Sequence, residues 1–301
     1  MSQVTALQEL QQVQQHTQAA INALSTQPDI ANKVDIKRIE AYATRLNAVL
    51  FNGKMNATQR NCVIMFTTVL AIARTLGAEI RPQYLAYILA TVYHETAFTM
   101  ASIEEYGKGK GHEYGKPHPV TGKLYYGRTY PQITWYENYK KAAENIVDLN
   151  MAHSVDLVNE PELALNPFYG AQITLFGMMQ GWFTGKKLAD YWSHGQFDYV
   201  GARRIINGTD KAQTIAGYAR EIESAIELGI GHKIERPLLK VGSRGDDVRE
   251  LQLLLKQSPD GTFGGATETA VRGYQTRNGL TADGKCGNST WNALEKEFYN
   301  L

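Results

Sequence analysis

The chain has 301 residues, of which 43% are hydrophobic and 20% charged, as is typical of a soluble globular protein with two or three domains. Its formal net charge is +1 and no basic patch or stripe is evident, so we expect no nucleic-acid partner. The chain has two cysteines, Cys62 and Cys286. We therefore expect neither a disulfide framework nor a cysteine-based metal site. We expect two reduced thiols, buried or partly buried.

The first residues contain no basic n-region and no apolar h-region, so they do not resemble a signal peptide. The longest apolar run, 63–73, ends at Arg74 and is too short to cross a bilayer. We therefore expect a protein that is made in the host cytoplasm and does not insert into a membrane. If its target lies outside that compartment, another factor must deliver it.

Residues 1–50 form a distinct, glutamine-rich segment. Apolar residues recur at helical spacing as far as Leu24, Pro28 interrupts the pattern, and a second helical pattern runs from Ile39 to Val49. We interpret the segment as a helical hairpin that packs on the main domain or on another copy of the chain. Its role is not indicated.

Residues 51–230 are predicted to be all-helical. The glycine- and proline-rich stretch 107–131 is expected to be a long loop, and long ordered loops in compact domains are commonly functional. Periodicity and capping signals predict helices at 59–76, from Pro82 onward, and near 135–148, 168–180, 186–192, 197–206 and 211–228.

Residues 231–237 are interpreted as a linker to a compact module at 238–301. This module contains eight basic and eight acidic residues. Any binding by it should therefore depend on shape and hydrogen bonds instead of net charge.

Glu95 is a candidate for acid chemistry. It lies three residues after Val92 and seven after Ile88, at or beside the apolar face of the helix that begins at Pro82. A carboxyl group against apolar surface tends to keep its proton because desolvation disfavours the charged form, and a general acid needs this state. An ordinary ion-paired glutamate near a helix end fits the same pattern.

Glu104 and Glu105 follow that helix and lie beside the glycine-rich loop. A carboxylate there is better hydrated and stays ionised, as a general base requires. Adjacent glutamates repel each other, so we expect one to face the site and the other to face solvent. Two exposed loop acids would also explain the pair, but two carboxylates in unlike surroundings are what cleavage of a glycosidic bond requires.

No cofactor or metal ion is expected. His94 and Glu95 begin like the zinc-binding motif HExxH, but residue 98 is Phe98, and the seven histidines show no ligand spacing.

The segment after the loop combines aromatic, amide and hydroxyl side chains of the kind that line sugar-binding sites. Aromatic rings stack on sugar faces, and amides and hydroxyls bind sugar hydroxyls or a water. A tyrosine-rich core segment would have the same composition. The residues in question are Tyr125, Tyr126, Arg128, Gln132, Thr134, Trp135 and Asn138.

Four segments in this order resemble glycoside hydrolase family 19, which contains plant-type chitinases and many phage endolysins. They are HETAF from His94, EEYG from Glu104, YYGRTYPQITWYENY from Tyr125, and ARRIING from Ala202. The resemblance covers roughly residues 51–230. It implies a lysozyme-like, mostly helical, two-lobed domain.

The resemblance also implies roles for single residues. Glu95 matches the general acid, Glu105 the general base with Glu104 as the fallback, and Thr134 the residue that helps to hold the attacking water. Substrate binding is expected from Tyr126, Arg128, Gln132, Asn138 and Asn207. The chain departs from the family at Thr129 and Tyr130, where chitinases usually have Gly-Pro, and at Thr214, where plant enzymes have an arginine; chitin specificity of the plant type is therefore in doubt.

The tail module is similar to the peptidoglycan-binding module of cell-wall hydrolases, a small three-helix fold. The similarity begins at Val241–Gln252 and continues through Asp260–Gly264, Asp283-Gly284 and Thr290-Trp291. It covers nearly all of 238–298.

Together these features predict an all-α, monomeric endolysin-type enzyme whose partner is bacterial peptidoglycan. It would cleave the β-1,4 glycan with inversion, for which the two carboxyl groups should lie about 6.5–9.5 Å apart. The absence of a signal peptide suggests release to the wall through a holin. The alternatives are a chitinase acting on N-acetylglucosamine polymers and a non-catalytic wall-binding or virion structural protein.

Overall fold

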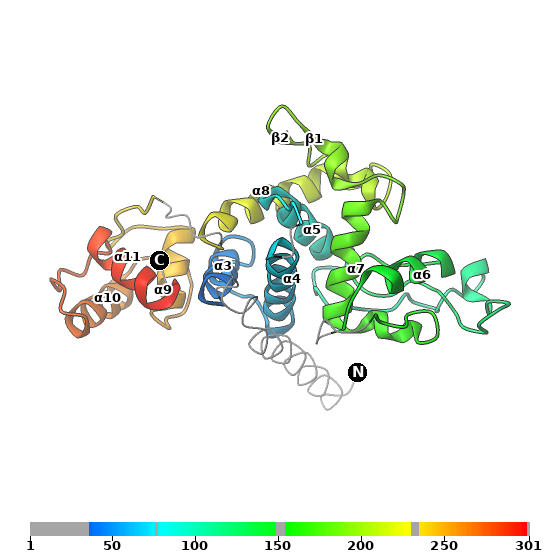
Figure 1. The fold of residues 1–301 in the computed structure, drawn as a ribbon. Helices are drawn as coiled ribbons and strands as arrows, with labels where there is room; N and C mark the ends of the chain where they lie inside the picture. Colours follow the sequence, from blue (N-terminus) through cyan, green and yellow to red (C-terminus); the bar gives the residue numbers. More distant parts are fainter. Residues whose placement is uncertain (1–35, 76–77, 149–153, 230–234, 300–301) are drawn as a thin grey trace. The chain divides into compact units, whose positions relative to one another are not determined.

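The computed structural model describes residues 36–75, 78–148, 154–229 and 235–299 (Figure 1). The chain forms two compact units. The first unit includes Ala57–Arg220, and the second joins Asp35–Asn56 to Glu221–Leu301. The described residues are mainly helical, which confirms the predicted fold class. The predicted domain boundaries stay predictions, and the first apolar stripe of the segment 1–50 lies outside the described residues.

The first unit is built on α4 (Ala57–Thr75), α5 (Pro82–Glu95) and α7 (Pro167–Gln180), which pack on one another (Figure 1). Helix α5 begins with a proline, as predicted, and every residue from Tyr84 to Val92 is buried. A helix that is apolar on all sides belongs at the centre of a domain. Helix α5 is therefore the central helix of the first unit, and Glu95 is its last residue.

Helix α7 has clear local signals at both ends. The side chain of Asn166 accepts a hydrogen bond from the backbone N–H of Phe168, and the helix ends at Gly181, whose φ of 77° is left-handed. The shorter α6 (Tyr136–Asn145) packs against α7, and α8 (Ala212–Gly229) crosses the boundary between the two units.

Between α7 and α8 the structure differs from the prediction. The expected helices near 186–192 and 197–206 are the short 3₁₀ helices η3 (Leu188–Tyr191) and η4 (Gly201–Ile205). A two-stranded antiparallel hairpin, β1 (Trp192–Ser193) and β2 (Gln196–Phe197), lies between them.

The hairpin has a physical cause in its turn. His194 and Gly195 both have positive φ, at 50° and 76°, which suits a two-residue turn between antiparallel strands. The Asp198 carboxylate then accepts hydrogen bonds from the N–H groups of Val200 (3.1 Å) and Gly201 (2.9 Å), an arrangement that favours a turn over a continuous helix.

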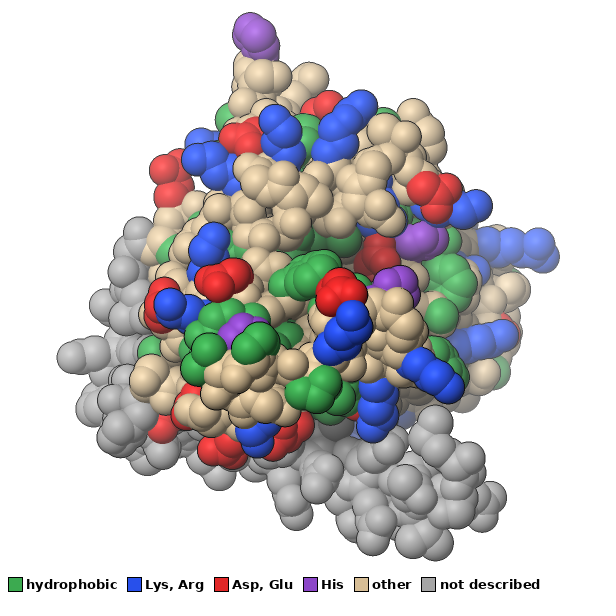
Figure 2. Space-filling model, turned by 90° about the vertical axis from the view of Figure 1, so that its right-hand side faces the viewer, with side chains coloured by type: hydrophobic (Ala, Val, Ile, Leu, Met, Phe, Trp, Pro, Cys, Tyr) green, Lys and Arg blue, Asp and Glu red, His purple; other side chains and the backbone are tan. Residues whose placement is uncertain are grey.

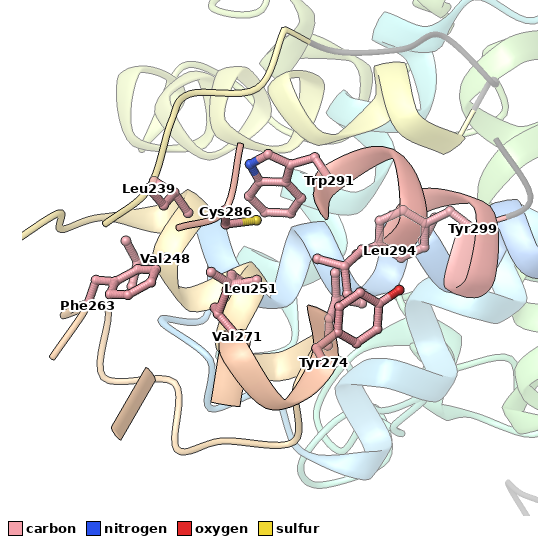
Figure 3. Packing of buried hydrophobic residues seen from close by; sticks show 12 residues of the cluster. Leu239, Val248, Leu251, Phe263, Val271, Tyr274, Cys286, Trp291, Leu294 and Tyr299 are labelled. Atoms are coloured by element: carbon pink, nitrogen blue, oxygen red, sulfur yellow. The ribbon is translucent and has the colours of Figure 1, made fainter. Parts of the chain in front are cut away.

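The second unit contains the predicted three helices, α9 (Asp246–Leu254), α10 (Gly265–Arg277) and α11 (Asn288–Leu294), followed by the π-helix η5 (Glu295–Tyr299). Their side chains surround one apolar cluster, in which Trp291 and Phe263 are almost completely buried (Figure 3). Cys286 lies in this cluster, while Cys62 belongs to the first unit; both thiols are buried and free, as expected.

Helix α3 (Ile36–Val49) confirms the second helical pattern of the N-terminal segment. It packs on α9 and η5, and its Ala41 belongs to the apolar cluster of the second unit. The sequence did not indicate this partner, since it predicted packing on the main domain or on another copy.

A buried charge cluster fixes these elements together. The Glu250 carboxylate is fully buried and accepts hydrogen bonds from Arg45 of α3 (2.9 Å), from Arg236 (2.7 and 2.9 Å) and from the Tyr299 hydroxyl (2.9 Å). Arg236, which the sequence assigned to a linker, also pairs with Glu295 at 2.8 Å. Burial raises the pKa of Glu250, but the hydrogen bonds and charge of Arg236, with the charge of Arg45, outweigh this and hold its pKa below the usual value.

Replacing Glu250 by Gln should destabilise the second unit by about 3–5 kcal/mol, because the buried Arg236 and the partly buried Arg45 lose the counter-charge that they share. The folded-state pKa is lowered, so the contribution of Glu250 is present above about pH 4.3 and is lost as the pH falls through the folded-state pKa. Hydrogen exchange of the α9 amides in the full chain measures both effects.

The control is Glu268→Gln, since Glu268 pairs with the half-exposed Arg272 at the surface. Equal loss of protection in the two variants would contradict a special role of the buried cluster.

Candidate functional site

Glu95 is the last residue of α5, and its carboxylate forms an ion pair with Arg203 of η4. The Glu95 side chain is 23% exposed, whereas that of Arg203 is 3% exposed. The Arg203 Nε also donates to the backbone oxygen of Asp210 at 2.9 Å, so the guanidinium is held from two directions. The surroundings of Glu95 therefore include a buried cation in addition to apolar surface.

Arg203 lies inside the segment ARRIING, and no role was predicted for it. The structure buries Arg203 and exposes its neighbour Arg204, a difference that two adjacent arginines in a sequence do not reveal. Gly201 at the start of η4 permits the close approach of Asp198, because a Cβ at residue 201 would lie 2.1 Å from the Asp198 carboxylate. This contact holds the turn that places Arg203 toward Glu95.

The backbone just after α5 is strained. Ala97, Phe98 and Met100 have positive φ values of 48°, 68° and 55°. The Thr96 hydroxyl stabilises the turn by donating to the Val92 oxygen (2.7 Å) and accepting from the Met100 N–H (2.8 Å). Strained residues cluster at functional sites, where the surrounding structure compensates for them.

The Glu104 carboxylate is held by a cation and a hydroxyl group. Its carboxylate pairs with Lys108 at 2.8 Å and accepts a hydrogen bond from the Tyr126 hydroxyl at 2.8 Å. The hydrogen bond from Lys108, supported by that from Tyr126, lowers the pKa of Glu104 despite partial burial.

Glu105 is held by the backbone and a tyrosine. Its carboxylate accepts hydrogen bonds from the Gly127 N–H (2.9 Å) and the Tyr114 hydroxyl (3.2 Å), and within the described part of the chain it makes no salt bridge. A Cβ at Gly127 would lie 2.7 Å from Oε1 of Gln132 and 3.0 Å from Oε2 of Glu105. The absence of a side chain at Gly127 thus allows Glu105 and Gln132 to converge.

Gln132, Thr134 and Asn138 form a connected group next to Glu105. The Thr134 hydroxyl donates to the Gln132 backbone oxygen (2.9 Å), and the Asn138 amide donates to the Thr134 oxygen (2.8 Å). The Gln132 amide in turn donates to the Thr129 oxygen at 2.9 Å. Thr134 keeps its hydroxyl oxygen as an acceptor, which a water molecule could use.

Arg128 and Tyr126 support this group from inside. Arg128 is buried, with its guanidinium carbon 3.7 Å from the centre of the Tyr126 ring, and it donates to the Tyr139 hydroxyl at 3.0 Å. Tyr139 donates to the Tyr126 oxygen at 2.8 Å. Both residues expected to bind substrate therefore make internal contacts, and their direct contact with substrate stays a prediction.

Thr129, one of the departures from family 19, is fully buried with φ of 64°. Its hydroxyl packs on Gly170 of α7, where a Cβ would lie only 2.1 Å from Oγ1. Asn207 is exposed, and its backbone N–H donates to the Arg203 oxygen at 3.0 Å. Thr214 is exposed on α8.

Aromatic rings lie close to Glu105. Trp135 is 52% exposed and its ring centre is 5.3 Å from that of Tyr114, which in turn stacks on His112 at 4.9 Å. Trp135 could be predicted from its place in the aromatic segment, whereas Tyr114 could not, because it lies in the glycine-rich loop far from that segment. Exposed rings beside a carboxylate can stack on a sugar.

Figure 2 shows one face of the molecule, on which acidic, basic and hydrophobic side chains are mixed and neither sign of charge dominates. Among the described residues, no group of His, Cys, Asp and Glu side chains could hold a metal ion. No described helix has the length and apolar character needed to cross a membrane.

Comparisons with known proteins concern a limited part of the chain. Residues 244–294 match the peptidoglycan binding domain family. An uncharacterized protein in the bpoA1 3' region of Kitasatospora aureofaciens is 37% identical over 89 residues, which are 27% of this chain and 75% of that protein. The zinc D-Ala-D-Ala carboxypeptidase of Streptomyces albus G is 41% identical over 64 residues, which are 19% of this chain and only 25% of that protein.

No solved structure matches the chain significantly. The family match confirms the predicted wall-binding module, while no comparison tests the predicted catalytic domain. Because the match extends over three quarters of the Kitasatospora protein, this chain belongs to the same family as that protein, and its residues 244–294 are a peptidoglycan-binding domain.

Proposed function

We propose that the protein is a peptidoglycan hydrolase that cleaves the β-1,4 glycan of the bacterial cell wall by an inverting acid–base mechanism. The observation that carries this proposal is the presence of two carboxylates in unlike surroundings, Glu95 beside Arg203 and Glu105 beside Gly127, on a chain with a peptidoglycan-binding domain. The resemblance of residues 51–230 to glycoside hydrolase family 19 supports it.

In this mechanism Glu95 gives its proton to the leaving glycosidic oxygen. Arg203 holds the carboxyl group in place and stabilises the negative charge that it then carries. Glu105 accepts a proton from a water that also donates to the Thr134 hydroxyl oxygen, and the water attacks the anomeric carbon from the opposite face. Glu104 is less suited to be the base because its carboxylate pairs with the Lys108 ammonium, whereas Glu105 makes no salt bridge with a described residue.

The peptidoglycan-binding domain contributes by tethering. A tether raises the effective concentration of wall polymer near the catalytic residues without tight binding. We also propose that the enzyme is made in the cytoplasm and reaches the wall after release through a holin.

Glu95→Gln should lower the rate of glycan cleavage by about 10²–10⁴-fold, because an amide cannot donate the proton. Mass spectrometry of the fragments released from purified sacculi measures this loss and identifies the bond that is cut. Glu105→Gln should cause a similar loss, whereas Glu104→Gln should keep most of the activity. Unchanged lysis by Glu95→Gln would favour the alternative of a non-catalytic wall-binding or virion protein.

Arg203→Lys should lower kcat more than it raises KM, because lysine keeps the charge but cannot hold both Glu95 and the Asp210 oxygen. The matched control is Arg204→Lys, at the adjacent exposed position. Thermal unfolding of both variants separates misfolding from misplacement of Glu95. Equal kcat values for the two variants would contradict the positioning role.

Wild-type protein should release soluble fragments from sacculi faster than it cleaves chitin oligomers, since tethering by the wall-binding domain raises the effective concentration of a long wall polymer but not that of short soluble oligomers. Product analysis on the two substrates tests this preference. Faster cleavage of chitin oligomers would favour the alternative of a chitinase.

A further inference from the structure

The second unit contains an internal duplication with a spacing of 23 residues, which repeats Gln252 as Gln275. In the first copy, the Gln252 amide donates to Asp260 (2.8 Å), to the Thr262 oxygen (3.1 Å) and to the Thr267 hydroxyl (3.1 Å). Its carbonyl accepts the N–H of Gly261 at 2.9 Å. One buried glutamine therefore organises the whole loop between α9 and α10.

The second copy repeats every one of these contacts. The Gln275 amide donates to Asp283 (2.9 Å), to the Lys285 oxygen (2.9 Å) and to the Thr290 hydroxyl (3.0 Å), and its carbonyl accepts the Gly284 N–H at 2.9 Å. Gly284 even has the same φ, 73°, as its counterpart in the first copy. The two loops thus have the same hydrogen-bonding scaffold. Residues of one copy can therefore be placed at the equivalent positions of the other to test their role.

The two copies differ in what lies beside them. In the first copy, Pro259 is in close contact with the turn that follows α3, since a Cβ at Gly53 would lie 2.4 Å from Cγ of Pro259. The second copy borders an open pocket of about 570 Å³. Its lining includes Leu238, Leu280, Asp283, Lys285, Asn288 and Ser289.

Some of the side chains that line the pocket differ between the copies, while Gln275, Asp283 and Thr290 are the same residue types in both. Thr262, Gly265 and Ala266 of the first copy correspond to Lys285, Asn288 and Ser289 of the second. At these three exposed positions the second copy has larger or additional hydrogen-bonding groups, whereas Lys256 and Gln257 of the first copy are replaced by Gly279 and Leu280.

The chemistry of the lining points to an uncharged ligand. Asp283 and Lys285 have opposite charges, so the pocket offers acceptors and donors without a net charge. Asn288 and Ser289 add an amide and a hydroxyl, and Leu238 and Leu280 add apolar surface. Hydroxyls, an acetamido group and apolar ring faces are the matching groups of an N-acetylated sugar.

We propose that the pocket of the second copy binds the N-acetylhexosamine strand of peptidoglycan, and that the stem peptide is not required. The choice of ligand deepens the wall-binding part of the proposed function. It is independent of catalysis, because binding is measured in chains that carry Glu95→Gln.

The test gives the open copy the residues of the first copy, in the triple variant Lys285→Thr, Asn288→Gly and Ser289→Ala. These residues already fit the same scaffold at 262, 265 and 266, so the fold is expected to persist, and circular dichroism checks it. Cosedimentation with purified sacculi should show at least tenfold weaker binding. The control Lys240→Thr removes an exposed charge elsewhere in the unit and should bind like the parent.

Competition identifies the ligand. Peptide-free glycan strands should displace the parent protein from sacculi, whereas free stem peptide should not, and raising the salt from 50 to 500 mM should change the affinity less than about twofold, since no net charge is paired. Chitin oligomers separate the two sources of this sugar chemistry: competition equal to that of glycan strands assigns the pocket to N-acetylglucosamine units, and weaker competition assigns it to the wall strand.

A correctly folded triple variant that binds within twofold of the parent, or displacement by stem peptide, would overturn the proposal. A wild-type chain that binds sacculi through this pocket and cuts no glycan would refute the proposed function and leave the pocket assignment intact.

Discussion

The buried carboxylate of Glu250 is the constraint on which the second unit depends. A charge without solvent must be compensated, and here the compensation comes from Arg45, Arg236 and Tyr299, which belong to three distant parts of the sequence. The apolar cluster around Trp291 could accept many arrangements of α3, but the fork of two guanidinium groups on one carboxylate accepts few. The ionic cluster thus adds directional contacts between α3 and α9 to the apolar contacts that Ala41 makes.

The first unit also pairs a buried charge with a counter-charge. Arg203 is buried, but the Glu95 carboxylate that it meets remains partly hydrated at the end of α5. The backbone is strained directly after Glu95, at residues 97, 98 and 100. The missing side chain of Gly127 lets Glu105 approach Gln132. These departures from regular structure occur at the residues that acid–base chemistry would use.

Much of the fold could be predicted from local signals. Pro82 and the apolar run after it marked α5, the helical pattern near 168–180 marked α7, and the motif residues of the tail marked the wall-binding domain. The hairpin at His194 was missed because its strands are two residues long, too short for a period to be seen. Arg203, Tyr114 and Arg45 were missed because their importance comes from contacts with residues far away in sequence, which periodicity cannot report. The positions of Glu95 and Glu105 could be nominated from sequence, but their partners required the structure.

Because α3 packs on α9, the second unit is built from two separate stretches of the chain. Residues 57–220 are an insertion, because the polypeptide contributes to the second unit both before and after them. A protease cut between α8 and residue 235 would not release a free wall-binding fragment, since Arg45 and Ala41 would still hold the two pieces together. Conversely, a truncation at residue 238 removes only part of that unit and uncovers the apolar face of α3. The compact unit that contains the peptidoglycan-binding domain is therefore discontinuous in sequence, and a fragment meant to contain all of that unit has to include residues from both sides of the insertion.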